Sequence, residues 1–290
     1  MYRYQRLLVP LSLADQDESA IRYAGLISRL ANSCKVTFAH VTDARDSIPD
    51  ELRAAFPDFE QSSDELVKKR MEELVARNFP ADGKPELAYE SLEGSPLIEL
   101  LRRTKDSDID LIIMAKRKEP TEVGSLPEKL IRKAPCSVLL VPEEAKPAFS
   151  NILAPTDFSE GSIDAMDVAV AFASAGGIDE IHSLHAYTVP IGYYKTGKSH
   201  EEFAEIIKGH AEKNFNEFLH KEVCQSGSVC RIKDLKGIEV TPIFMLEKKP
   251  AKAIEEVVKN HNIDLLVIGA EAADLSPRIM PAPGRPLLHG

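Results

Sequence analysis

The chain has 290 residues, of which 43% are hydrophobic and 28% charged, and its formal net charge is -10 at pH 7. This balance allows buried cores and excludes disorder, collagen and coiled coil as descriptions of the whole chain. The acidic excess opposes binding to nucleic acids and anionic lipids, and the four cysteines are too few for a disulfide scaffold. With no signal-peptide core at the N-terminus, we expect a cytoplasmic protein with reduced thiols that binds neither nucleic acid nor membrane.

Short apolar runs alternate with helical patterns through the first half of the chain. Ile21, Ala24 and Ile27 recur at helical spacing, for example, and follow an apolar run typical of a strand. The expected strands are 6–10, 35–41, 86–92, 110–115 and 137–141, and the expected helices are 18–31, 64–76, 96–103 and 127–133. This alternation predicts a doubly wound parallel sheet with helices on both faces.

The second half repeats the first. Residues 8–12 match residues 153–157 at an offset of 145, and residues 109–115 match residues 263–269 at an offset of 154. The repeated elements are expected at 151–155, 159–174, 180–187, 199–223, 238–246, 250–261 and 264–270. We therefore predict two domains, residues 1–145 and 150–290, joined by a charged linker that contains proline.

Prolines make the end of the second copy atypical. Pro242 interrupts its third strand and should place that strand at a sheet edge, because proline removes a hydrogen-bond donor. Four prolines between residues 277 and 286 exclude the final helix, and leave 286–289 as a candidate short fifth strand. The edge strand at 137–141 should pair with that tail or with a second molecule. The chain is thus expected to form an intramolecular domain pair or a homodimer.

Five motifs resemble those of the universal stress protein family, in the family's order and with examples from both copies. They are Ala154-Pro155-Thr156-Asp157, His40-Val41, Gly94-Ser95-Pro96, the strand from Asp264 to Gly269, and Cys136-Ser137-Val138-Leu139. The resemblance covers nearly the whole chain. It implies two tandem Rossmann-like domains of the adenine nucleotide alpha hydrolase-like type, each with a parallel sheet of order 3-2-1-4-5. It also implies a role in the stress response.

The resemblance implies a nucleotide site beyond the carboxyl ends of the strands, where the strand order reverses. In nucleotide-binding members an Asp after the first strand contacts the nucleoside, and a Gly-x2-Gly-x9-Gly-Ser/Thr loop cradles the phosphates. The first copy has Ser12, Ala115 and Lys118 at the Asp and first two Gly positions, although Gly124-Ser125 is retained. We expect no nucleotide in this copy.

The second copy keeps part of the pattern. The nucleotide-binding candidates there are Pro155, Thr156, Asp157, Ala186, Gly269 and Ala270. The resemblance implies ATP or AMP as the ligand of this copy alone, with Mg²⁺ left open. Glu271 and Ala272 oppose a phosphate cradle, because one is acidic and the other replaces glycine. Asp157 and Ser159 are equally explained as caps of the following helix.

Residues 192–199 satisfy the P-loop pattern G-x-x-x-x-G-K-[ST] between a strand and a helix. Gly197, Lys198 and Ser199 are therefore candidates for phosphate contact. Against a P-loop, the segment follows the second strand of its copy and contains two adjacent tyrosines. Three interpretations stay open: an ATPase loop, a lysine-bearing loop that touches an anionic ligand or partner, and a solvated loop.

No catalytic residue or metal site is predicted. His200, His210 and His220 point in different directions on one helix, and His182 and His185 lie on opposite faces of one strand. The leading hypothesis is a tandem universal stress protein, a non-catalytic or weakly catalytic regulator whose second copy binds an adenine nucleotide. The alternatives are a nucleotide-free interaction protein with two decayed sites and, third, a weak ATPase.

Overall fold

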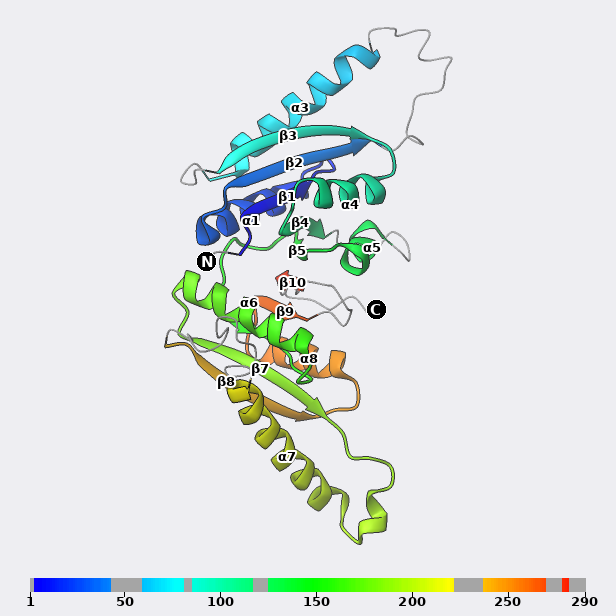
Figure 1. Cartoon of the computed structure of the whole chain (residues 1–290), viewed down its shortest axis with the longest axis vertical. Helices are drawn as coiled ribbons and strands as arrows, with labels where there is room; N and C mark the ends of the chain where they lie inside the picture. Colours follow the sequence, from blue (N-terminus) through cyan, green and yellow to red (C-terminus); the bar gives the residue numbers. More distant parts are fainter. Residues whose placement is uncertain are drawn as a thin grey trace. The chain divides into compact units, whose positions relative to one another are not determined.

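A computed structural model describes residues 3–42, 59–80, 85–116, 125–221, 237–269 and 278–281. The chain divides into two compact units, residues 1–148 with 273–281 and residues 149–272 with 282–290. Each unit contains a parallel sheet covered by helices, as Figure 1 shows. Within the described residues, no helix has the length and apolar character needed to cross a membrane.

The first unit has the predicted strand order. Its strands are β1 (Arg6–Pro10), β2 (Lys35–Thr42), β3 (Glu86–Glu93), β4 (Leu111–Lys116) and β5 (Ser137–Pro142). They pair in parallel in the order β3-β2-β1-β4-β5. The order reverses between β1 and β4, because the chain moves outward from β1 in one direction and then returns to its other side. This confirms the order 3-2-1-4-5 for the first copy.

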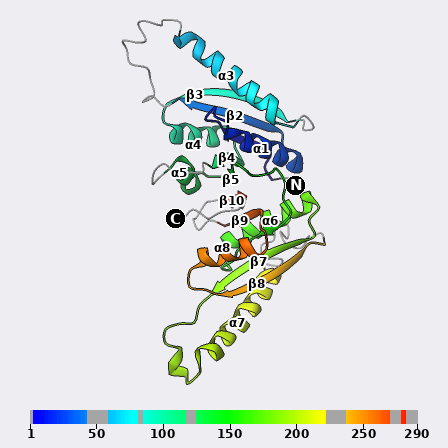
Figure 2. The same cartoon turned by 180° about the vertical axis from the view of Figure 1, so that it is seen from behind.

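In the described part of the first unit, four helices cover the two faces of this sheet (Figures 1 and 2). They are α1 (Asp17–Ala31), α3 (Phe59–Asn78), α4 (Pro96–Asp106) and α5 (Leu126–Lys133). Helix α1 packs with α3, and its apolar stripe is fully buried at Ala20, Ala24 and Ile27. Helices α4 and α5 bury Leu100 and Leu130 in a separate cluster on the other face. Helix α3 begins five residues before the predicted start.

The tail adds a strand to the first unit. Strand β10 (Arg278–Pro281) pairs with β5 in parallel, with Ile279 opposite Leu139. The tail strand expected at residues 286–289 lies outside the described residues. Within the described part of the tail, the segment that pairs with β5 is thus eight residues earlier than the segment expected from the sequence.

The second unit repeats the topology without a fifth strand among its described residues. Its strands are β6 (Ile152–Leu153), β7 (Glu180–Tyr187), β8 (Glu239–Leu246) and β9 (Leu265–Ile268), in the order β8-β7-β6-β9. The predicted fold class is confirmed, but the 3-2-1-4-5 order is seen only for its first four positions within the described part of this unit, since β10 belongs to the first unit. Strand β8 lies at the sheet edge, which confirms the prediction from Pro242.

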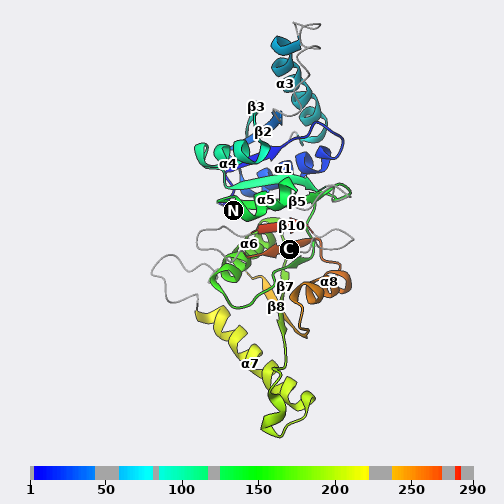
Figure 3. The same ribbon diagram turned by 90° about the vertical axis from the view of Figure 1, so that its right-hand side faces the viewer.

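The helices of the second unit are α6 (Glu160–Gly176), α7 (His200–Lys221) and α8 (Pro250–Asn260), with a short 3-10 turn, η2 (Tyr193–Thr196), before α7. Alternate residues of β7 face opposite sides of the sheet. Leu184 packs with Ala253 and Val257 of α8, whereas the His185 ring contacts Phe218 of α7 through Phe158. Figure 3 shows α7 extending outward from its sheet toward η2.

Candidate functional site

Asp157 lies at the point where the strand order of the second sheet reverses. It follows β6, and Gly269 follows β9, the parallel neighbour of β6. The carboxyl ends of these strands therefore bring both residues to one edge of the sheet, where open α/β sheets bind their ligands. The Asp157 side chain is exposed at this edge, whereas Thr156 before it is buried.

One oxygen of the Asp157 carboxylate is held by the protein. Oδ1 accepts a hydrogen bond of 2.6 Å from the Ser162 hydroxyl and one of 2.9 Å from the Ser159 backbone N–H. Burial raises the pKa of Asp157, but the hydrogen bonds from Ser159 and Ser162 outweigh this effect and hold the pKa below its usual value. The site therefore favours an ionised carboxylate whose Oδ1 is fixed in place.

Ser159 has the capping role that the sequence predicts for it. It is the N-cap of α6, and its hydroxyl accepts a hydrogen bond of 3.3 Å from the Ser162 N–H. Asp157 accepts the N–H of Ser159 itself, two residues on, which is a turn-forming contact that comes before the helix. The two residues thus have different local roles.

Gly269 is required for close packing between β9 and α6. A Cβ atom at this position would lie 2.0 Å from the carbonyl oxygen of Gly161 and 2.9 Å from the Ser162 nitrogen. The absence of a side chain at Gly269 is therefore explained by contact with the protein itself. This contact brings the end of β9 against the residues that hold Asp157.

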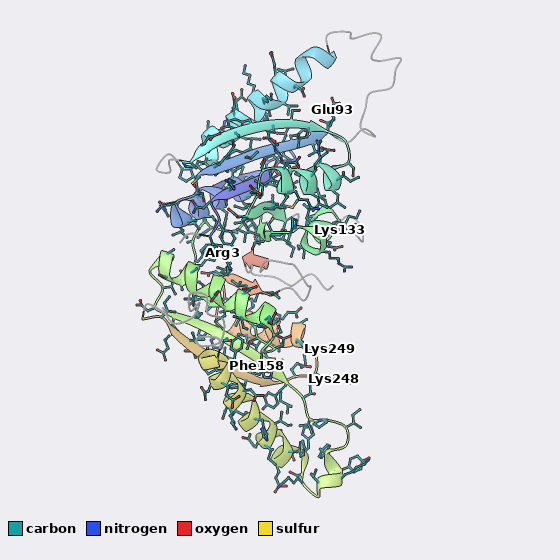
Figure 4. The ribbon with its side chains drawn as sticks, viewed as in Figure 1. Arg3, Glu93, Lys133, Phe158, Lys248 and Lys249 are labelled. Atoms are coloured by element: carbon teal, nitrogen blue, oxygen red, sulfur yellow. The ribbon has the colours of Figure 1, made fainter. Side chains whose placement is uncertain are left out.

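The loop between β6 and α6 is fixed from β7 by a histidine. His185 Nδ1 lies 2.9 Å from the carbonyl oxygen of Thr156, a distance at which a protonated Nδ1 donates to it. The His185 ring stacks on Phe158 at 4.3 Å between centroids. Phe158, which is labelled in Figure 4, has a φ of 67° in the left-handed region. His40 Nδ1 lies 2.9 Å from the carbonyl oxygen of Leu11 in the same way in the first unit.

The first unit has a buried carboxylate at its corresponding loop. The Ser12 hydroxyl lies 3.1 Å from Oδ1 and 3.2 Å from Oδ2 of Asp17, and the Ala14 N–H donates to Oδ2. Asp17 is only 3% exposed. Burial raises the pKa of the Asp17 carboxyl, and the hydrogen bonds from Ser12 and the nearby backbone offset this only in part. This carboxylate faces the protein, unlike that of Asp157.

The other predicted site residues are dispersed. Ala186 packs against the apolar cluster on the α8 face of β7, and half-buried Pro155 precedes Thr156 in the loop. Ala270 lies outside the described residues, as do Lys118 and Gly124 of the first copy. The described structure therefore gathers Pro155, Thr156, Asp157 and Gly269 and leaves Ala186 on the α8 face.

The segment from Gly192 to Ser199 forms a turn and a helix cap. Figure 1 shows η2 at the outer end of α7, away from the strands. Ser199 and Glu202 make a capping box: the Glu202 N–H donates to the Ser199 hydroxyl, and the Ser199 N–H donates to the Glu202 carboxylate. The Glu202 carboxylate thus accepts the Ser199 N–H, which is one of the backbone donors that a P-loop would offer to phosphate. The geometry favours an exposed loop over an ATPase loop.

Ser162 and its counterpart Asp17 are not among the site residues predicted from the sequence. Both lie five residues after the loop position that was identified, Asp157 or Ser12, so extension of the 145-residue offset would have aligned them. Two histidines of the second unit also meet, since the ring centroids of His182 and His261 lie 4.8 Å apart. No group of three or more metal-ligating side chains occurs in the part of the chain that the structure describes.

Comparison with known proteins identifies the repeat. The model of the universal stress protein family matches residues 3–142 and again residues 148–281. The chain belongs to the universal stress protein family, as a tandem member. No curated protein is significantly similar to it.

Solved structures match over the whole length or over one repeat. A universal stress protein from Archaeoglobus fulgidus is 16% identical, with 96% of this chain and 98% of that chain covered and a TM-score of 0.60. Protein PA1789 from Pseudomonas aeruginosa is 15% identical, with 96% and 92% covered and a TM-score of 0.54. These two show the fold. A universal stress protein in complex with cAMP is 18% identical, with 49% and 99% covered and a TM-score of 0.36.

Proposed function

We propose that this universal stress protein is a cytoplasmic stress-response regulator whose second unit binds an adenine nucleotide, ATP or AMP. The observation that carries the proposal is the exposed Asp157 carboxylate at the switch point between β6 and β9. Its Oδ1 is held by Ser159 and Ser162. Each carboxylate oxygen has about two acceptor positions, so Oδ2 can accept hydrogen bonds from the hydroxyl or amine groups of a nucleoside.

A nucleotide-free interaction protein is the second candidate function. Gly269, the first glycine of the expected phosphate loop, is in van der Waals range of the Gly161 backbone. This glycine therefore serves packing whether or not phosphate binds. Under this alternative, Asp157 and its serine partners only tie the loop to α6.

Calorimetric titration of the full chain with ATP and with AMP separates the two candidates. Nucleotide binding by the second unit predicts one site per chain, loss of binding in Asp157→Ala, and unchanged binding in Ser12→Ala. Absence of binding for both nucleotides would favour the interaction protein. A stoichiometry of two per chain would contradict restriction of the site to the second unit.

A further inference from the structure

The two units contain the same serine and aspartate pair with the residues exchanged. The 145-residue offset places Ser12 on Asp157 and Asp17 on Ser162. The loop position, 12 or 157, is exposed in both units, and the helix position, 17 or 162, is buried in both. The first unit thus buries its carboxylate and exposes its hydroxyl, whereas the second unit does the reverse.

The hydrogen bond between the two positions survives this exchange. The hydroxyl of Ser12 donates to Asp17 at 3.1 Å, and the hydroxyl of Ser162 donates to Asp157 at 2.6 Å. Either order ties the loop to the first turn of the helix, because the pair needs one donor and one acceptor. The fold is therefore satisfied by both orders, and only the location of the charge differs.

The location of the charge decides what each unit presents to a ligand. Asp17 accepts hydrogen bonds from the Ser12 hydroxyl and the Ala14 N–H, and the residue is 3% exposed. Asp157 accepts the Ser159 N–H and the Ser162 hydroxyl on Oδ1 and is exposed at the sheet edge. A carboxylate rotates freely about two side-chain torsions unless it is held, so the Ser162 hydroxyl fixes the direction of Oδ2.

We infer that Ser162 is a positioning residue for Asp157, and that the order of the serine and aspartate pair determines which unit presents a ligand-binding carboxylate. This inference rests on the proposed nucleotide site of the second unit. The exchange of serine and aspartate between these two positions accounts for the exposed carboxylate in the second unit and the buried one in the first. Ser162 acts through Asp157 and does not itself contact the ligand.

The first test compares Ser162→Ala with Ser183→Ala. Ser183 is a matched control, because its buried hydroxyl also makes a hydrogen bond within the second unit, to the Ala154 carbonyl at 3.0 Å, but none to Asp157. We expect Ser162→Ala to weaken AMP or ATP binding roughly tenfold, as the loss of a hydrogen bond to a charged group does. Ser183→Ala should leave the affinity unchanged while both variants lose similar thermal stability.

A second readout does not depend on nucleotide. The pKa of Asp157, followed by NMR titration of the labelled carboxyl carbon, should rise toward its usual value in Ser162→Ala and stay low in Ser183→Ala. If the wild-type chain binds neither nucleotide, the proposed function fails, and this titration still decides whether Ser162 holds Asp157. An unchanged pKa in Ser162→Ala would overturn the inference whatever the binding result.

The double variant Asp157→Ser with Ser162→Asp tests the order of the pair directly. It recreates the order of the first unit, so we expect cooperative unfolding, loss of nucleotide binding, and a carboxyl at position 162 that titrates above its usual range like Asp17. Retained wild-type affinity in this variant would contradict the inference. If the close contact at Gly269 prevents the double variant from folding, Ser162→Ala decides the same question through affinity and pKa.

Discussion

Asp157 and Asp17 differ in how protonation affects the folded state. The pKa of Asp157 is lowered, so its contribution to stability is present above the unfolded value near 3.8 and is lost as the pH falls through the folded value. The pKa of Asp17 is raised by burial, so its contribution is present below 3.8 and is lost as the pH rises through the folded value. The exchanged pair therefore gives the two units opposite pH dependences.

Neutral variants should reveal this difference. As the pH falls below 3.8, the stability advantage of the wild type over Asp157→Asn should shrink, because the favourable ionised form is lost. As the pH rises above 3.8, Asp17→Asn should gain relative to the wild type, because its buried side chain no longer ionises. Thermal unfolding over this range measures both differences. If the stability difference between wild type and variant changed with pH in the same direction for both variants, the environment of one aspartate would be misassigned.

The packing of Gly269 predicts a large effect from one methyl group. Gly269→Ala places Cβ 2.0 Å from the Gly161 carbonyl oxygen, and the required backbone shift should cost about 1–3 kcal/mol of unfolding free energy or more. Gly192→Ala is the control, since Gly192 has a φ of -90° and no atom within 4 Å of an added Cβ. Its unfolding free energy should change by less than about 0.5 kcal/mol. Urea unfolding of both variants tests the contact, and equal midpoints would refute it.

At the scale of elements, an aspartate before the fourth strand of each copy secures the start of the first strand. Asp110 accepts hydrogen bonds from the backbone N–H groups of Gln5 and Arg6 at 2.8 and 2.9 Å. Asp264 accepts from Ser150 and Asn151 at 2.8 and 3.0 Å. The aspartate at the start of the 264–269 motif is therefore explained by its hydrogen bonds to the start of the first strand.

Removal of either aspartate should destabilise its own unit. Asp264→Ala and Asp110→Ala each remove two hydrogen bonds to a carboxylate and leave two strand N–H groups without that acceptor, so we expect losses of about 1–3 kcal/mol. Glu86→Ala, which removes only an exposed ion pair with Lys35 on a neighbouring strand, should cost less than about 1 kcal/mol. Chemical unfolding gives these differences. A Glu86→Ala loss as large as the other two would show that the backbone contacts are unimportant.

At the scale of the whole molecule, the tail strand β10 pairs with β5. A parallel edge strand exposes backbone N–H and C=O groups that can pair with another chain. Strand β5 is buried from Ser137 to Val141 and apolar from Val138 to Val141. We propose that pairing by the chain's own tail takes the place of pairing with a second molecule.

Truncation tests this proposal. Ending the chain at Ala272 removes β10 and should expose β5, and we expect self-association in analytical ultracentrifugation together with a lower midpoint for the first unit. Ending it at Pro281 keeps β10 and should leave the wild-type state of association. A monomer of unchanged stability after truncation at Ala272 would count against any role for β10.

Local patterns in the sequence determined the secondary structure and the repeat. The apolar period predicted α4, α5 and α8 from their first turns, and the prolines correctly placed β8 at an edge, because these properties depend on neighbouring residues along the chain. Matches at two offsets identified the tandem copies, and motifs in order indicated the family. Of the candidate site, the sequence identified Asp157 and the end of β9, since both follow directly from strand order.

The tertiary structure decided what surrounds these residues. The hydrogen bond from Ser162 to Asp157 spans only five positions, whereas Asp264 reaches Asn151 across 113 positions of sequence. Gly269 contacts Gly161 through the packing of a helix against a strand end. Strand β10 pairs with β5 of the other copy, although its sequence follows β9. Such partners depend on the path of the whole backbone, whereas periodicity reports only on residues a few positions apart.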